Sequence, residues 1–416
     1  MGDRMRTCHT LLALVRRQLN GPAVVGLLSV VLIFSMVFLP DAQIMVAMNQ
    51  DGSKGPGGSE LSLTAPPMID TKHAAETFMT TIHGADVSVT YTEEAYDGYN
   101  LFVLAEVGTS WSMTLLITDM RGNVVYEKDL GGQEPLADMP IEFINSTTLL
   151  GGDTYGAFLH NIYTNQTVRL PIMGHHEYEY NARNNTFFTF VNYDVSINGT
   201  LYRYDMLYEY DMLGNITWSL DTQSFIPPSH WCPYREMKGS AGDVTHSNTI
   251  FYDDVEDVIY YLSRNTNTMY KINHSDGAVL WGLGEYGDFR QYDEDGHRKH
   301  SLFYHAHAVE RIDEDTFIIF DNDVHNQDDY SSYSSAMLEI DINESTMTAN
   351  VSWAWRASKP YWCIRWGDAD RLPNGNRLGT FGTEYHLDTN LCARLVEVNN
   401  AGQIVWKMDF HRTNNY

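Results

Sequence analysis

The chain has 416 residues, of which 43% are hydrophobic and 19% are charged. This balance excludes a disordered chain and a coiled coil, and the length allows two or three domains or one large all-β unit. The formal net charge of −27 is unfavourable for a nucleic-acid-binding protein, which needs clustered cations. The 26 Tyr, 9 Trp and 31 Gly favour many short strands joined by turns.

The first feature along the chain is an apolar segment that predicts a membrane anchor. Ala23–Leu39 has no charged residue and is just long enough, as a helix, to cross the hydrocarbon core of a bilayer. Residues 1–20 carry a net charge of +3, so the positive-inside rule places them in the cytoplasm and everything after residue 40 on the extracytoplasmic side. No small-x-small cleavage site follows Leu39, which favours an uncleaved single-pass signal-anchor at 21–40 over the alternative, a cleaved signal peptide.

Eight Asn-x-Ser/Thr sequons follow the apolar segment and none precedes it. They predict surface turns and N-glycosylation in an exported protein, although Asn-rich turns also generate this pattern without a glycan. The sequons begin at Asn145, Asn165, Asn184, Asn198, Asn215, Asn273, Asn343 and Asn350.

Three cysteines lie on the predicted outer side, at Cys232, Cys363 and Cys392. They can supply one disulfide and one spare thiol, and the sequence does not specify which pair forms. Since no Cys-x-x-Cys motif occurs, a cysteine-based zinc site is not expected. No metal or cofactor is predicted.

Residues 41–84 are predicted to be an extracytoplasmic linker, because the stretch Asn49–Pro67 has the composition of a flexible tether. Residues 85–416 form the predicted folded domain. Within it a unit of strand, Asn/Asp/Gly turn, strand and aromatic residue recurs, and such turns between alternating runs are hairpin signals. The unit occupies 115–130, 207–220, 269–284, 338–355 and 395–410, with a degenerate copy at 140–171.

These six units predict an all-β fold, a six-bladed β-propeller, because a four-stranded blade needs about 40–50 residues. A blade cannot bury both of its faces alone, so recurrent aromatic residues should pack between neighbouring blades. These residues are Tyr126, Trp218, Trp281, Trp355 and Trp406. No long segment of helical period follows residue 84, and a pair of β-sandwiches is the rival fold.

Polar residues at the openings of the repeats are the candidates for a functional site, since propellers bind ligands near the innermost strand of each blade. Four openings carry them, at 241–253, 303–323, 365–382 and 383–388. The first contains His246 and Asn248, and the last contains His386. The second contains His305, His307, Asp321 and Asn322. If the openings meet on one axis, their histidines converge. A hydrogen-bonded structural pair is the simpler interpretation of His305 and His307, and half of a metal site is the other.

In their order along the chain these sequences resemble the bacterial and archaeal arylsulfate sulfotransferases, a family of propeller enzymes. The similarity covers about 88–410 and is carried by DVTHSNTIFYD with VIYYLSRNTNTMYKINHSDGAVLWGLG, by HAHAVE with FIIFDND, and by LPNGNRLGTFGTEYHL. The resemblance implies sulfuryl transfer from an aryl sulfate to an acceptor phenol through a sulfohistidine, with neither a nucleotide donor nor a cofactor. It implies His386 as the nucleophile, His246 and His307 around the sulfuryl and phenolic oxygens, and Asn248 and Asn322 as members of the matched motifs.

The chemistry of the transferred group agrees with such a site. A neutral imidazole is a good nucleophile near pH 7, and a second histidine can protonate the leaving phenoxide. The charge of a sulfuryl group lies on three equatorial oxygens, so cations and hydrogen-bond donors should provide most of the catalysis. Because the chain is acidic overall, the pocket must be locally positive.

One departure from the family concerns this positive charge. The family has an Arg shortly after Phe-Asp-Asn-Gly, whereas this chain reads Phe320-Asp321-Asn322-Asp323 without the Arg. Arg365 is the first candidate for the missing cation, with His305 or His325 behind it. The alternative function is a membrane-tethered, non-catalytic propeller that binds a ligand or protein partner. A homo-oligomer is possible, because the sequence specifies no oligomeric state.

Overall fold

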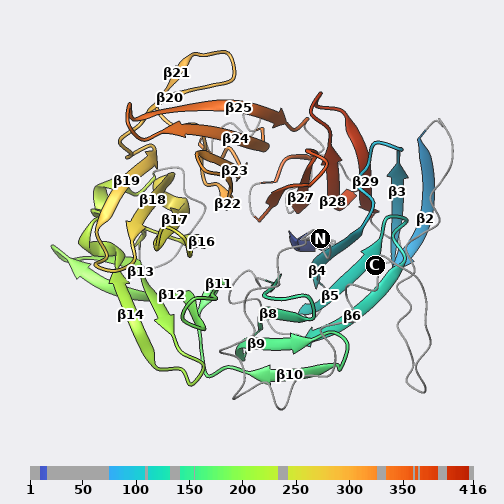
Figure 1. Cartoon of the computed structure of the whole chain (residues 1–416), viewed down its shortest axis with the longest axis horizontal. Coiled ribbons are helices and arrows are strands. Elements are labelled where there is room, and N and C mark those ends of the chain that lie inside the picture. The colour runs from blue at the N-terminus through green and yellow to red at the C-terminus, as the bar shows by residue number, and fades with distance from the viewer. Residues whose placement is uncertain are drawn as a thin grey trace, which may run out of the picture.

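The computed structural model describes residues 10–15, 75–107, 111–131, 141–153, 155–232, 242–325, 334–358, 361–363, 366–382 and 391–411. In these ranges the secondary structure is strands plus three short 3-10 helices, η4 (Thr222–Ser224), η5 (Pro228–His230) and η6 (Arg264–Thr266). Six sheets surround a central axis (Figure 1). The predicted six-bladed β-propeller is therefore confirmed, and the rival β-sandwich pair is wrong.

In the first three blades, antiparallel strands follow one another from the axis outward in chain order. Blade one is β1 (Thr10–Val15), β4 (Tyr99–Val107), β5 (Trp111–Asp119) and β6 (Val124–Gly131). Blade two is β7 (Ile141–Phe143), β8 (Thr148–Asp153), β9 (Gly156–Asn161) and β10 (Gln166–Arg169). Blade three is β11 (His175–Asn181), β12 (Thr186–Ile197), β13 (Thr200–Tyr210) and β14 (Ile216–Asp221), with β15 (Gly242–Asp243) parallel to β13.

The last three blades follow the same order, and two of them gain strands at their outer edges. Blade four is β16 (Ser247–Asp253), β17 (Val258–Ser263), β18 (Thr268–Asn273) and β19 (Val279–Gly284). Blade five is β22 (His307–Asp313), β23 (Thr316–Asp321), β24 (Ala336–Asn343) and β25 (Thr348–Arg356), extended by β20 (Arg290–Tyr292) and β21 (Arg298–Lys299). Blade six is β26 (Asp368–Arg371), β27 (Arg377–Gly382), β28 (Leu391–Val398) and β29 (Ile404–His411), extended by β3 (Ala85–Tyr91) and β2 (Glu76–Ile82).

Blade six is completed by strands from both ends of the propeller. β29 pairs with β3, and β3 pairs with β2 across a two-residue turn. His83 and Gly84 in this turn have φ values of 49° and 80°, the left-handed conformation that suits a tight hairpin. β2 lies inside the segment 41–84 predicted as a linker, so blade six extends beyond the predicted boundary. Side chains of β2 alternate between partial burial and exposure, and this half-polar pattern gave a weak strand signal.

The recurring sequence unit is the outer hairpin of a blade, as β5 and β6 illustrate for 115–130. Its aromatic residue reaches the next blade. Trp406 is fully buried in blade six and donates its indole N–H to the carbonyl of Met120 in blade one at 2.8 Å. Tyr126, Trp218, Trp281 and Trp355 contact His160, His274, Phe317 and Phe381 of their next blades. The prediction that these aromatic residues pack between blades is confirmed.

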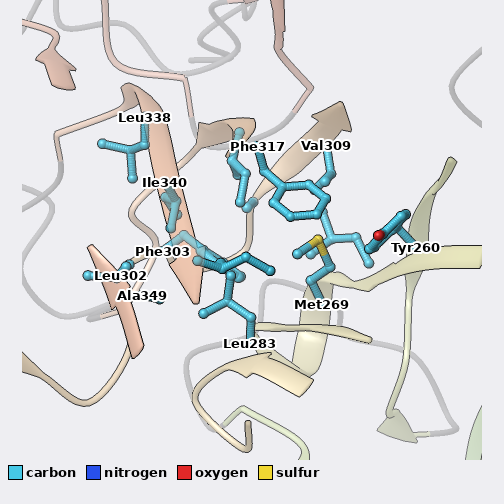
Figure 2. Close-up of a cluster of buried hydrophobic side chains, with 14 of the residues drawn as sticks. Tyr260, Met269, Leu283, Leu302, Phe303, Val309, Phe317, Leu338, Ile340 and Ala349 are labelled. Atoms are coloured by element: carbon cyan, nitrogen blue, oxygen red, sulfur yellow. The ribbon is translucent and has the colours of Figure 1, made fainter. Parts of the chain in front are cut away.

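The interface between blades four and five shows how such packing holds the inner strands in place (Figure 2). Tyr260 and Met269 of blade four pack in one cluster with Val309 and Phe317 of blade five. Phe303, just before β22, is fully buried in this cluster. Burying each large side chain contributes about 1.5–3 kcal/mol. The start of β22, where two candidate site histidines lie, is therefore attached to a well-packed core.

The predicted membrane anchor, Ala23–Leu39, lies outside the described residues, and the transmembrane assignment stays a prediction. In the described part of the chain, no helix has the length and hydrophobicity needed to cross a bilayer. β1 comes from the segment 1–20 that was predicted to be cytoplasmic. It pairs with β4 and lies beside β26, β27 and β28 of blade six, near the central axis (Figure 1).

Two other features predicted for an exported protein, the sequons and the cysteines, can be located on the propeller. Seven of the eight sequon asparagines are exposed, and the eighth, Asn273, is half-buried. Glycan attachment itself stays a prediction. Cys232 and Cys363 are both buried and do not form a disulfide with each other, and the side chain of Cys392 lies outside the described residues.

Candidate functional site

Three consecutive blades carry histidines where their innermost strands begin. His175 is the first residue of β11, His246 immediately precedes β16, and His307 is the first residue of β22. β11, β16 and β22 are neighbours, because blades three, four and five follow one another around the axis (Figure 1). The three openings therefore gather histidines at one end of the propeller axis.

The backbone at these openings adopts an uncommon conformation. His176, His246 and His305 have φ values of 63°, 41° and 52°, in the left-handed region that favours glycine. Such residues cost free energy and persist where the surrounding structure holds them, often at functional sites. At all three openings this conformation turns the backbone where the connection between blades meets the innermost strand.

His307 is held by Asn322, which follows the end of β23. The Asn322 amide donates hydrogen bonds to the carbonyls of Cys363 at 2.7 Å and Trp366 at 2.8 Å, so its Oδ1 is left as an acceptor. Nδ1 of His307 lies 2.5 Å from this oxygen and must carry a hydrogen to donate to it. Nε2 of neutral His307 is then a basic nitrogen. Burial, followed by the positive charge of Arg264, holds the pKa of His307 well below its ordinary value.

His305 is fully buried, and neither of its ring nitrogens has a hydrogen-bond partner among the described residues. Its backbone N–H donates to Oδ1 of Asn267 at 2.8 Å, which fixes the position of the residue. Asn248 of β16 donates to the carbonyl of Ala306 at 3.1 Å, and its own buried Oδ1 has no described partner. Burial and then Arg264 hold the pKa of His305 well below its ordinary value, so the ring is neutral.

His246 is half-buried and pairs through Nδ1 with Oδ2 of Asp243 at 2.7 Å. Asp243 belongs to β15 and is attached to blade three, so this contact bridges two blades. A carboxylate only accepts hydrogen bonds, so Nδ1 of His246 carries the hydrogen and Nε2 points elsewhere. The ring of His246 lies 4.9 Å from the ring of His176, centroid to centroid.

Arg264, in η6 between the second and third strands of blade four, supplies a positive charge beside these histidines. Its side chain is 3% exposed, its backbone N–H donates to the carbonyl of His246 at 3.3 Å, and Nη1 donates to Oδ1 of Asn265 at 3.1 Å. After burial, its charge contributes to lowering the pKa of His305 and of His307. The locally positive site expected for an anion in an acidic protein thus has a cation among the described residues.

Two of the predicted site residues, His386 and Arg365, lie outside the described residues. His325, a reserve candidate for the cation, is 36% exposed and pairs through Nδ1 with Asp323 at 2.9 Å. This hydrogen bond raises the pKa of His325 above its ordinary value. Its charge is therefore shared with a carboxylate, which makes it a weak ligand for an anion.

Four residues near the openings were not predicted from the sequence: His175, His176, Asp205 and Arg264. The pair His175-His176 opens the third repeat just as His305 and His307 open the fifth, so the recurrence of histidines was an available signal. Arg264 lies within a sequence that carries the family resemblance. Asp205 is on the third strand of blade three, and no local pattern places it near β11 and β16.

The arrangement provides neutral imidazoles with basic nitrogens and one buried guanidinium. Neutral imidazoles act as nucleophiles and general bases, and a guanidinium stabilises oxyanions. Among the described residues, no group of three or more metal-ligating side chains occurs. Such a set of groups at the end of a propeller axis can support nucleophilic chemistry on an anionic group.

Comparison with known protein families agrees with this description of the fold and the site. The profile of the arylsulfotransferase (ASST) family matches residues 84–416, and the chain belongs to this family. The resemblance seen in the sequence is thus confirmed, and membership supports an aryl sulfotransferase activity at the level of the family. Comparison with curated protein sequences gives no match.

Similar solved structures share low sequence identity with the chain. Dihydro-heme d1 dehydrogenase NirN, in complex with DHE, is 13% identical, with 75% of this chain and 73% of that chain covered and a TM-score of 0.35. A putative 6-phosphogluconolactonase from Bacteroides uniformis is 9% identical, with 77% and 90% covered and a TM-score of 0.36. A hypothetical selenium-binding protein from Sulfolobus tokodaii is 8% identical, with 65% and 75% covered and a TM-score of 0.34.

Proposed function

We propose that the protein transfers a sulfuryl group from an aryl sulfate to an acceptor phenol through a sulfohistidine on His386. The observation that carries this proposal is the gathering of His246 and His307 with buried Arg264 at one end of the axis, in a member of the arylsulfotransferase family. In the first half-reaction an imidazole nitrogen bonds to sulfur as the aryl oxygen leaves. In the second, the oxygen of the acceptor phenol bonds to sulfur as the nitrogen leaves.

The remaining residues have separate roles in this proposal. Arg264 stabilises the charge on the sulfuryl oxygens, which is the largest contribution expected for such a transfer. Nε2 of His246 and Nε2 of His307 are available to hydrogen bond with sulfuryl or phenolic oxygens. His305 and Asn248 line the same site, and Asn322 acts through His307 as a positioning residue.

The test of this function uses the full chain with 4-nitrophenyl sulfate as donor and phenol as acceptor. We expect release of nitrophenol that depends on the acceptor, together with phenyl sulfate detected by mass. Release that does not depend on the acceptor would identify a sulfatase instead. No release from folded protein across several donors and acceptors would support the alternative, a non-catalytic propeller that binds a ligand or protein partner.

We also propose that the propeller is held on the extracytoplasmic face of a membrane by Ala23–Leu39. The positive residues before this segment and the exposed sequons after it support this location. The family match begins at residue 84, so β1 lies outside the matched residues. In an anchored chain, residues 1–20 lie on the opposite side of the membrane from the propeller. β1 then cannot pair with the inner edge of β4.

A chain that starts at residue 68 is therefore expected to unfold at the same temperature as the full chain and to keep its activity, because β2 through β29 are retained. The measurement is thermal unfolding by circular dichroism, with the same assay as above. A chain that starts at residue 92 is the control, since it also loses β2 and β3 and should be much less stable. A marked loss of stability in the chain from residue 68 would show that the propeller needs β1 in blade one and would rule out the anchored arrangement.

A further inference from the structure

Asp205 on β13 is a buried carboxylate that is surrounded by hydrogen-bond donors. It is 2% exposed. Oδ2 accepts from the Ser247 N–H at 2.9 Å, from Ser247 Oγ at 2.7 Å and from Thr245 Oγ1 at 2.7 Å. Burial opposes ionisation, but hydrogen bonds from His175 and Ser247 hold the pKa of Asp205 well below its ordinary value. The group is therefore a fixed negative charge near neutral pH.

The other oxygen of Asp205 faces a pair of histidines. Nε2 of His175 lies 3.0 Å from Oδ1 of Asp205, and Nδ1 of His175 lies 2.7 Å from Nδ1 of His176. The carboxylate only accepts, so Nε2 of His175 carries a hydrogen. The contact between the two Nδ1 atoms then needs one hydrogen, and either ring can supply it.

The two arrangements differ by one proton. When His176 supplies the hydrogen, both rings are neutral and Nε2 of His176 has a lone pair. When His175 supplies it, His175 is an imidazolium beside Asp205, and Nε2 of His176 carries a hydrogen. A proton that arrives at Nε2 of His176 thus displaces the Nδ1 proton onto His175, where the carboxylate stabilises the positive charge. The ring of His176 lies 4.9 Å from His246, within the candidate site.

We propose that Asp205, His175 and His176 form a proton relay for the acceptor phenol, with His176 as the general base. This inference rests on the proposed function. As the oxygen–sulfur bond to the acceptor forms and the nitrogen–sulfur bond breaks, the phenolic proton passes to Nε2 of His176. In the other half-reaction the same proton returns to the departing phenoxide. The relay holds this proton from the second half-reaction of one turnover to the first half-reaction of the next, so the full cycle needs no proton from solvent.

The relay is tested with Asp205→Asn and His175→Gln in the full chain, with 4-nitrophenyl sulfate as donor and two acceptors. Phenol is un-ionised at neutral pH and must lose a proton, whereas pentafluorophenol is already ionised. Loss of a positioned base costs about 10²–10⁴-fold in rate. We expect a loss of about 10²-fold or more with phenol. With pentafluorophenol, which needs no base, we expect a loss of less than about tenfold.

Ser247→Ala is the matched control, because it removes one hydrogen bond to Oδ2 of Asp205 and leaves the contact between Oδ1 and His175. It should change the rates with the two acceptors by the same factor. An equal loss with both acceptors in Asp205→Asn and His175→Gln, measured on variants that remain folded, would overturn the relay.

A measurement without turnover separates this inference from the proposed function. Buried imidazole N–H protons in the relay should give slowly exchanging low-field proton NMR signals in the wild-type protein, and Asp205→Asn should remove them. If the wild type has these signals but no transferase activity, the relay stands and the proposed function fails. If the wild type lacks the signals, the relay itself is wrong.

Discussion

Replacing His386 by alanine is expected to lower acceptor-dependent sulfuryl transfer by at least about 10⁴-fold, because the residue that forms the covalent intermediate is removed. With labelled aryl sulfate and no acceptor, the wild-type protein should retain acid-labile label and the variant should retain none. His297→Ala is a suitable control. That histidine is 75% exposed on the hairpin of β20 and β21, away from the inner strands.

The topology of the described strands supports this choice of nucleophile. In blade five, His307 at the start of β22 pairs with Phe320, one residue before the end of β23, and Asn322 follows that end. In blade six, Asp368 at the start of β26 pairs with Thr380 near the end of β27. The connection between β27 and β28 contains His386 and is thus the counterpart of the connection that carries Asn322. If His386→Ala still retained label, the nucleophile would have to be sought at His246 or His307.

The outer hairpins were predictable from the sequence because their signal is local. Turn residues between alternating runs specify a hairpin within about 15 residues, and each copy ends in an aromatic residue that fills an inter-blade gap. Trp406 and Trp281 are examples in which such a residue is almost completely buried. The closure of the ring depends instead on pairing β3 with β29, more than 300 residues apart in sequence, and no local pattern specifies a partner at that distance.

The candidate site was predictable only in part, for the same reason. His246, His305 and His307 were found because they open repeats and fall in motifs. Asp205 lies in the middle of β13, where a buried polar residue interrupts an otherwise ordinary strand pattern. The order of strands in blade three brings it to His175 on β11, and the packing of blade three on blade four brings Ser247 to it. The sequence indicates which blades contribute histidines to the site. The position of Asp205, the buried carboxylate behind these histidines, depends on contacts within and between blades.

The positive charge of the site illustrates this limit. The cation predicted from the sequence was Arg365, which lies in the connection that opens blade six. Arg264 was not among the candidates, although Ser263-Arg264 lies within a sequence that carries the family resemblance. In the structure it is nearly fully buried beside His246 and influences the pKa of His176, His305 and His307.

Arg264→Gln is expected to lower kcat/KM for the aryl sulfate by about 10³-fold, the lower end of the range measured when a cation is removed from a comparable transfer. Gln keeps part of the volume and a hydrogen-bond donor for Asn265, so the loss reports on charge. Arg264→Lys should recover part of the rate, since it restores the charge without the planar fork. Arg203→Gln is the matched control, because Arg203 forms an exposed pair with Asp194 on blade three.

The pH profile distinguishes a charge effect from a structural one. After burial, Arg264 lowers the pKa of His305 and of His307, so removing its charge should let both pKa values rise. These imidazoles act in their neutral form. The acidic limb of kcat/KM, where they become protonated, should therefore move to higher pH in Arg264→Gln. A variant that is merely misfolded would lose activity at all pH values without moving this limb, and an unshifted limb with unchanged binding of inorganic sulfate would exclude Arg264 as the cation of the site.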